Sequence, residues 1–242
     1  MKTKFFIFLI LFLISFTLAY RYDETIKKTF PADREGTIKL ANINGNIKIS
    51  THSDEEFKIE AVQMANSKAE FAKMEIEFLS DGKNLNIRVR KKEKSCKVSI
   101  DFCLKVPEKV LSVDLLTILG NIETEGEYRD IKLKTVNGQI DFEGNFTGSV
   151  FNTVSDDITI YVENELAGDM QVKTYNGDIK IDLDPDSSFN IEAFALTGKI
   201  RNEFKLLARK VSAGRELKGT INQGRNKVNL KTQNGDIKIF RK

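Results

Sequence analysis

A short phrase built around an Asn-Gly pair recurs along this chain and limits its fold more than any other feature. The phrase is marked by a glycine, or by the residue that replaces it, at Gly45, Gly120, Gly138, Asp156, Gly177, Gly198, Gly219 and Gly235. The last seven marks are separated by 18, 18, 21, 21, 21 and 16 residues, so the second half of the chain is a sequence repeat.

An isoleucine stands two residues after every mark. The eight are Ile47, Ile122, Ile140, Ile158, Ile179, Ile200, Ile221 and Ile237, and the residues on both sides of each are polar. This alternation indicates a β-strand with one face in the core. A period near 20 residues is too short for a pair of helices and fits one coil of a β-solenoid, with coils stacked about 4.8 Å apart.

We therefore predict an all-β chain that contains a parallel β-solenoid of about 18–21 residues per coil. The isoleucines should form an interior column, and the Asn-Gly turns should repeat at one corner, where glycine and asparagine tolerate positive φ. An antiparallel series of hairpins stays open as an alternative, because Asn-Gly is also a strong hairpin signal. The constant isoleucine favours the solenoid, since hairpins do not require it.

The repeat is weaker in residues 20–111, which we predict to be an N-terminal β-rich cap in front of the solenoid at residues 112–242. A solenoid needs caps because its terminal coils expose unpaired strand edges. The early copy at Asn44-Gly45 should enter the same sheet. We expect a helical turn or two at Ala65–Phe71, and strands at Thr37–Leu40, Lys58–Val62, Met74–Phe78, Leu85–Val89 and Val98–Lys105.

Residues 1–19 have the pattern of a secretory signal. Lys2 and Lys4 give a charged start, Phe5 to Leu18 is an apolar run without a charge, and Ala19 ends a small-residue cleavage site. A transmembrane helix needs about 20 apolar residues, so we expect cleavage, with a retained anchor as the alternative. The mature chain then has no transmembrane segment and is exported to the periplasm, the cell surface or the medium.

Charge and cysteine content limit the partners further. Residues 1–19 hold two lysines and no acid, so the remaining chain has 36 basic and 35 acidic residues and a net charge of +1. We therefore do not expect it to bind nucleic acid. In an oxidising compartment Cys96 and Cys103 could form a disulfide. Their odd spacing puts them on opposite faces of a strand, so the bond needs a turn or bulge, and two buried free thiols are the alternative.

Few residues suggest catalysis or cofactor binding. His52 is the only histidine, which disfavours a Ser-His-Asp triad and histidine-rich metal sites. Asp157 and Asp178 follow their turns at the same offset and should lie on adjacent coils, where a carboxylate pair could serve a glycan-cleaving enzyme. An exposed acidic corner explains them equally well. Alternate carboxylates at Asp182, Asp184 and Asp186 form a weak calcium candidate, and we expect no cofactor.

Two further rows follow from stacking. Thr117, Thr135, Thr153 and Thr174 could form an ice-binding face, although Ala195 and Glu216 break the row. Apolar residues stand two places before seven of the eight marks and should form an interaction stripe if alternation turns them outward. If the chain bends there, they are simply core. They are Ile43, Ile118, Val136, Val154, Tyr175, Leu196 and Leu217.

Three copies of the phrase, Thr135–Ile140, Thr174–Ile179 and Thr232–Ile237, read Thr-x-Asn-Gly-x-Ile, and the stretch Ile100–Pro107 ends in Val-Pro. These residues resemble the bacterial putative-adhesin family of DUF4097-like exported β-strand-repeat proteins. The resemblance implies a location at the cell envelope and an adhesin-like role. We expect a non-catalytic interaction or structural module whose partner is a protein or glycan of the envelope, or a second copy of the chain. An enzyme acting on envelope polysaccharide is the alternative.

Overall fold

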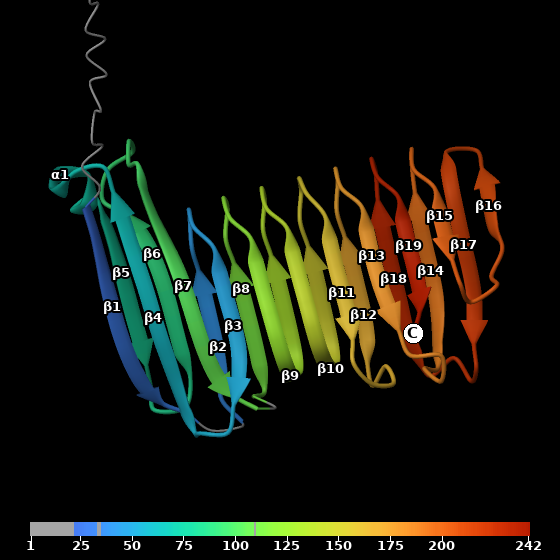
Figure 1. Ribbon diagram of the computed structural model, residues 1–242, viewed down its shortest axis with the longest axis horizontal. Helices are drawn as coiled ribbons and strands as arrows, with labels where there is room; N and C mark the ends of the chain where they lie inside the picture. Colours follow the sequence, from blue (N-terminus) through green and yellow to red (C-terminus); the bar gives the residue numbers. More distant parts are fainter. Residues whose placement is uncertain (1–21, 33–34, 109) are drawn as a thin grey trace, which may run out of the picture.

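The computed structural model describes residues 22–32, 35–108 and 110–242, so the predicted signal at residues 1–19 lies outside the described residues. Within the described part, nineteen strands and one short helix, α1 (Lys68–Phe71), form two rows of paired strands. The rows face each other across a continuous core (Figure 1). No helix in this part of the chain is long and apolar enough to cross a membrane.

The first sheet contains the strands that leave the Asn-Gly corners, together with three strands at its N-terminal end. In spatial order they are β1 (Tyr22–Pro31), β4 (Glu56–Ala65), β7 (Val98–Pro107), β3 (Ile47–His52), the first halves of β9 (Ile122–Lys134) and β10 (Ile140–Asn152), β11 (Ile158–Val162), β13 (Ile179–Leu183), β19 (Ile237–Arg241) and β15 (Ile200–Asn202). All neighbours from β7 to β15 are parallel.

The second sheet contains the strands that approach the corners, together with an antiparallel pair of strands at each end. In spatial order they are β5 (Met74–Ser80), β6 (Leu85–Lys91), β2 (Thr37–Ala41), β8 (Ser112–Leu116), the second halves of β9 and β10, β12 (Asp169–Lys173), β18 (Asn226–Thr232), β14 (Phe189–Ala195), β17 (Gly214–Ile221) and β16 (Ala208–Val211). β9 and β10 bend from the first sheet into the second.

Each regular coil passes up one sheet, turns at an Asn-Gly corner and returns down the other sheet. All corners therefore line one long edge of the molecule, the upper edge in Figure 1, which we call the corner edge. Parallel pairing stacks Ile47, Ile122, Ile140, Ile158, Ile179, Ile237 and Ile200 in one buried column. The predicted parallel solenoid is confirmed, and the hairpin alternative is wrong for these coils.

The copy of the phrase at Gly219 is not a corner. Gly219 and Ile221 lie in β17, which runs antiparallel to β14 and to β16. A tight turn that contains Gly214, with φ of +102°, reverses the chain before β17. Ile221 is only half-buried and stands outside the isoleucine column. In a coil, the isoleucine two residues after the mark lies in the core. In this hairpin, the same position lies outside the isoleucine column.

At both ends of the stack, the order of coils in space differs from their order in the chain. The coil made by β18 and β19 lies between the β12–β13 coil and the β14–β15 coil. The coil made by β2 and β3 lies between the strands β6 and β7 and the β8–β9 coil. We call these two the inserted coils. The early phrase at Asn44-Gly45 does enter the common stack, as predicted.

Antiparallel strands close the N-terminal end. β1 pairs with β4, and β5 pairs with β6. Phe30 stacks on Phe78 at 5.8 Å between ring centroids and joins the two layers. All five strands expected there lie within β2, β4, β5, β6 and β7, and the expected helical turn is α1. β1 was not predicted, because only Tyr22, Ile26 and Phe30 face inward and no alternation marks it.

Candidate functional site

The corners repeat the same contacts from coil to coil. A buried threonine opens each of five corners, and its hydroxyl donates a hydrogen bond to a backbone carbonyl of the neighbouring corner. The pairs are Thr117 with Gly45 (3.2 Å), Thr135 with Gly120 (3.0 Å), Thr153 with Gly138 (3.0 Å), Thr174 with Asp156 (3.1 Å) and Thr232 with Gly177 (2.9 Å). Because these hydroxyls point inward, the ice-binding interpretation is wrong.

Glycine is favoured at the corners because the neighbouring coil passes close to the Cα atom and leaves little room for a side chain. A Cβ atom on Gly138 would collide with the backbone carbonyl of Gly120, and φ there is +158°. Asp156 replaces glycine in the next corner and holds a φ of +137°. Its own carboxylate accepts the N–H of Asp157 at 3.0 Å.

At five marks, the residue after the mark links its corner to a neighbouring one. Its side-chain oxygen accepts the backbone N–H of the equivalent residue in the neighbouring coil. The pairs, acceptor first, are Asn46 with Asn121 (2.9 Å), Asn121 with Gln139 (2.9 Å), Asp157 with Asp178 (2.7 Å), Asp178 with Asp236 (2.7 Å) and Asp236 with Lys199 (2.8 Å). We call this row the corner ladder.

Asp157 and Asp178 have a structural role, because their carboxylates join neighbouring corners in the ladder. Burial alone would raise the pKa of Asp178, but the Lys238 ammonium at 2.8 Å and the N–H of Asp236 lower it below its ordinary value. A carboxylate held ionised by these donors is poorly suited to deliver a proton as a general acid. The pair singled out for glycan cleavage is therefore explained by corner structure.

The apolar residues two places before the marks form a row that we call the corner stripe: Ile43, Ile118, Val136, Val154, Tyr175 and Leu196. The carbonyls of the first five accept backbone N–H groups from the next coil, as in Ser155 to Val136 and Asn176 to Val154, both at 2.8 Å. Ile118, Val154, Tyr175 and Leu196 are exposed, at 43%, 45%, 46% and 39%. Val136 is half-exposed, and Ile43 packs partly against the core. Gln233 lies between Tyr175 and Leu196 in the row.

One predicted member of the stripe is wrong, and two exposed leucines beside it were missed. Leu217 is fully buried in β17, where it pairs with Ala193 of β14 and Ala208 of β16. Its place in an antiparallel strand turns it inward. Leu116 and Leu119 are exposed at 38% and 46% beside Ile118. Leu119 stands where the other corners have Asn, Ser or Thr, and this departure from the phrase could have revealed it.

The two cysteines are free thiols. Cys96 is half-buried against the core just before β7, and Cys103 is exposed on β7. From Val98 to Cys103 the chain is one uninterrupted strand. The Cα atoms of the two cysteines are therefore farther apart than the ~7 Å that a disulfide allows. The predicted disulfide is not formed, and the alternative of two buried thiols is wrong for Cys103.

The calcium candidate does not assemble. Asp182 lies on β13 at 3.6 Å from the Lys180 ammonium, and a carboxylate oxygen of Asp184 accepts the N–H of Asp186 at 2.8 Å. Among the described residues, no group of three or more histidine, cysteine, aspartate or glutamate side chains lies close enough together to hold a metal ion. Asp182, Asp184 and Asp186 therefore serve a strand and a turn.

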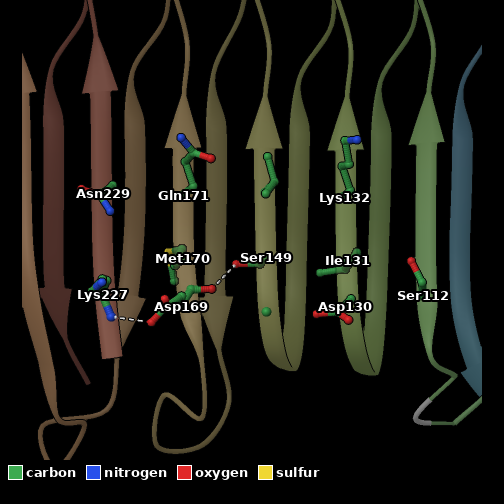
Figure 2. A pocket seen from close by; sticks show the side chains of 12 residues that line it. Ser112, Asp130, Ile131, Lys132, Ser149, Asp169, Met170, Gln171, Lys227 and Asn229 are labelled. Atoms are coloured by element: carbon green, nitrogen blue, oxygen red, sulfur yellow. Dashed lines mark hydrogen bonds between the residues drawn. The ribbon is translucent and has the colours of Figure 1, made fainter. Parts of the chain in front are cut away.

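The outer face of the second sheet has a shallow depression of about 520 Å³ where Gly148 lies between Asp130 and Asp169 (Figure 2). Asp169 accepts the N–H of Lys227 at 2.8 Å through its carboxylate. None of the twelve lining residues is aromatic. The depression therefore does not favour glycan cleavage.

Comparison with known proteins agrees with this architecture. A family model described as Toastrack DUF4097 matches residues 12–240. A solved "putative cell adhesion protein" from Clostridium sporogenes is 14% identical, with a TM-score of 0.51, and 90% of this chain and 100% of that chain are covered. A "putative adhesin" from Bacteroides fragilis is 10% identical, with a TM-score of 0.39 and coverage of 89% and 97%. A search of curated proteins found no match. At such identities, the likeness to the Clostridium protein shows a shared fold alone.

Proposed function

Because the chain belongs to the Toastrack DUF4097 family, we propose that it is a non-catalytic interaction module of the bacterial envelope and that the corner stripe is its contact surface. The proposal rests above all on one observation. Apolar side chains recur at the same position of four successive coils, at Ile118, Val136, Val154 and Tyr175, and all of them except the half-exposed Val136 are exposed. Stacked coils repeat this position every ~4.8 Å. A continuous row of exposed apolar side chains is typical of an interaction surface.

The stripe has rigid support. A threonine that is tied to the neighbouring corner precedes four stripe residues, and the carbonyls of the same four are tied to the next coil: Ile118, Val136, Val154 and Tyr175. These bonds hold the exposed side chains in a fixed row, so little conformational entropy is lost when they are covered. The carboxylates that could have supported the enzyme alternative are instead engaged in the corner ladder. An interaction module therefore accounts for the corners better than an enzyme does.

The test is to add protease to bacterial cells whose outer membrane, where there is one, has been permeabilised, and then to sediment the purified protein with isolated envelopes. We expect protease access without cell lysis. We also expect Val136→Asp with Val154→Asp to lower envelope binding by roughly tenfold or more, because two apolar contacts are lost. Leu79→Asp is the matched control, since Leu79 is exposed at 49% on β5, away from the stripe.

Three results would contradict the proposal. The first is protection from protease until the cells are lysed, which would place the chain in the cytoplasm. The second is equal loss of envelope binding in the Leu79 variant, which would make the effect nonspecific. The third is release of glycan fragments by the purified chain. Thermal melts of all variants verify that each one is folded.

A further inference from the structure

The phrase places a chemically reactive pair at several corners. Asparagine followed by glycine can react with its own backbone, because attack of the glycine nitrogen on the side-chain carbon Cγ closes a five-membered ring. Glycine has no Cβ to obstruct this approach. The four Asn-Gly pairs of the chain are Asn44-Gly45, Asn137-Gly138, Asn176-Gly177 and Asn234-Gly235, and all four lie at corners. The folded structure therefore decides which of them can react.

The stack protects the first three pairs. In each of them the glycine N–H donates a hydrogen bond to a backbone carbonyl of the neighbouring corner. The bonds run from Gly45 to Leu119 at 2.8 Å, from Gly138 to Ser155 at 3.2 Å and from Gly177 to Asn234 at 2.9 Å. The nitrogen attacks only after it has lost its proton, so each of these bonds would have to break first.

The fourth pair lacks this protection. Its outer neighbour is the last corner, where Thr197 stands in place of the usual asparagine. Isolated bridges join the successive corners from Asn44 to Asn234, and none of the described bridges joins Asn234 to this last corner. Among the described residues, the N–H of Gly235 also has no hydrogen-bond acceptor. Asn234 is exposed and Gly235 is half-buried, so solvent reaches the pair.

The side-chain amide of Asn234 has polar neighbours on both sides. Its Nδ2 atom donates to Oδ1 of Asn176 at 2.7 Å. The Thr197 hydroxyl lies 3.2 Å from Oδ1 of Asn234 and 3.1 Å from the carbonyl of Gln233, and it has one proton for the two acceptors. When it donates to Oδ1, it stabilises the negative charge that develops on this oxygen during the attack.

We propose that Asn234 is a site of spontaneous modification, at which the folded chain converts asparagine to aspartate or isoaspartate. The Gly235 nitrogen gives its proton to solvent and bonds to Cγ of Asn234. The bond from Cγ to Nδ2 breaks, and the side-chain nitrogen takes up a proton and leaves as ammonia. Water then opens the resulting succinimide at either of its two carbonyls. One water is consumed and one ammonia is released. This inference goes beyond the proposed function and does not rest on it.

Neither product fits the corner as asparagine does. Aspartate cannot donate to Oδ1 of Asn176. Isoaspartate adds a methylene to the backbone directly before Gly235, whose Cβ position already collides with the carbonyl of Gly177. The outermost coil, β14–β15, pairs with the coil that carries this corner. We therefore expect the modification to loosen the outermost coil.

The test compares the four pairs within one wild-type chain, which is aged at mildly alkaline pH either folded or in guanidinium chloride. Peptide mapping by mass spectrometry measures conversion at each pair, and isoaspartyl methyltransferase labels the isoaspartate. In the folded chain, Asn234 should convert roughly tenfold or more faster than Asn137 and Asn176, because their glycine N–H groups are hydrogen-bonded. In denaturant the four rates should be similar. The rate at Asn234 should rise with pH, since the nitrogen reacts without its proton.

Asn234→Gln is the matched control, because it keeps the amide but requires a larger ring. It should stop the reaction at this position and leave the other three pairs unchanged. Hydrogen exchange in β14 and β15 should become faster in the aged wild-type chain but not in the aged variant. Equal conversion of Asn137 and Asn234 in the folded chain would overturn the inference. So would an unmodified Asn234 in folded protein after a time in which the denatured chain has reacted. If Asn234→Gln does not fold, the comparison of folded and denatured wild-type chain still decides.

Discussion

The coils from Ile118 to Asn176 and the two ends of the stack use the same corner but differ in how the chain connects them. In the first region, each corner pairs with the next one along the chain, as Asn137 does with Ser155. At the C-terminal end, Asn234 pairs with Asn176, 58 residues earlier, and the coil that follows Asn176 in the chain lies one place further out. The phrase therefore specifies the structure of a corner but does not specify which other corner stacks on it.

Contacts in the inserted coil and in the regular coils are equivalent. Thr232 donates to Gly177 at 2.9 Å, and Thr153 donates to Gly138 at 3.0 Å. Asp236 donates its N–H to the Asp178 carboxylate at 2.7 Å, and Asp178 donates its N–H to the Asp157 carboxylate at 2.7 Å. Equivalent contacts mean that any coil with the phrase can stack on any other. The connections choose the order, and the β16–β17 hairpin, which occupies the outer edge of the second sheet, is the connection at this end.

Gly138→Ala should have the largest effect. The new Cβ would collide with the backbone of Gly120, which cannot move without shifting a whole coil, so we expect destabilisation above ~4 kcal/mol. Gly82→Ala is the matched control, since Gly82 has a φ of +88° and no atom near its Cβ position. It should cost only the ~1–2 kcal/mol of an unfavourable φ. Equal melting shifts in the two variants would contradict close stacking at the corner.

Next come the interior isoleucines. Ile140→Ala and Ile179→Ala should each cost about 2–5 kcal/mol, because both are completely buried in the column. Ile221→Ala should cost less than about 1.5 kcal/mol, since Ile221 is half-buried in the hairpin despite its place in the phrase. Denaturant titration of the three variants measures this difference. Changes below ~0.5 kcal/mol at both column positions would be incompatible with stacked coils.

A smaller effect is expected from Thr153→Val, which keeps the shape of the side chain and removes the donor to Gly138. The buried carbonyl then lacks this partner, at a cost of about 1–2 kcal/mol. Thr197→Val, in the exposed last corner, should change stability by less than ~0.5 kcal/mol. Chemical denaturation measures both variants, and a larger loss at Thr197 would reverse the ranking of inner and outer corners.

The smallest effect concerns pH. The folded-state pKa of Asp178 lies below its ordinary value of 3.8, so its stabilising contribution is present above that value and is lost as pH falls through the folded pKa. The carboxylate is partly exposed, so solvent screening should hold the change below ~1 kcal/mol. Asp178→Asn keeps the ladder acceptor and should flatten the acid limb of stability against pH. An unchanged limb would exclude Asp178 as its source.

The phrase predicted the parallel coils, the isoleucine column and the corner edge, because each follows from the local spacing of a few side chains. It could not predict the inserted coils, since Gly235 and Gly198 carry the same local information and differ only in which neighbour they meet. The burial of Leu217 also could not be predicted from its local sequence. Its offset from Gly219 matches the stripe, but the turn at Gly214 reverses the strand and buries it.

The corner ladder was within reach of the sequence. Short side chains with an acceptor oxygen follow most marks, as at Asn46, Asn121 and Asp157, and their bonds to the next coil explain that choice. We interpreted these positions only as a polar corner, because a side chain that bonds to another coil has no local signature. β1 was missed for a related reason: its partner, β4, decides which of its few apolar residues turn inward.

The inserted coils also set the order in which the molecule can be completed. Residues 226–241 fill a place between two coils that are synthesised before them, so the outermost coil cannot reach its final neighbours until the C-terminus has arrived. Until then, β14 can pair directly with β12, in the place that β18 occupies in the finished structure. β18 and β19 must then separate these strands before they can insert, so the topology predicts a slow final folding step. A chain that emerges from the ribosome or a secretion channel N-terminus first thus stays unfinished at its far end until its last residues are free.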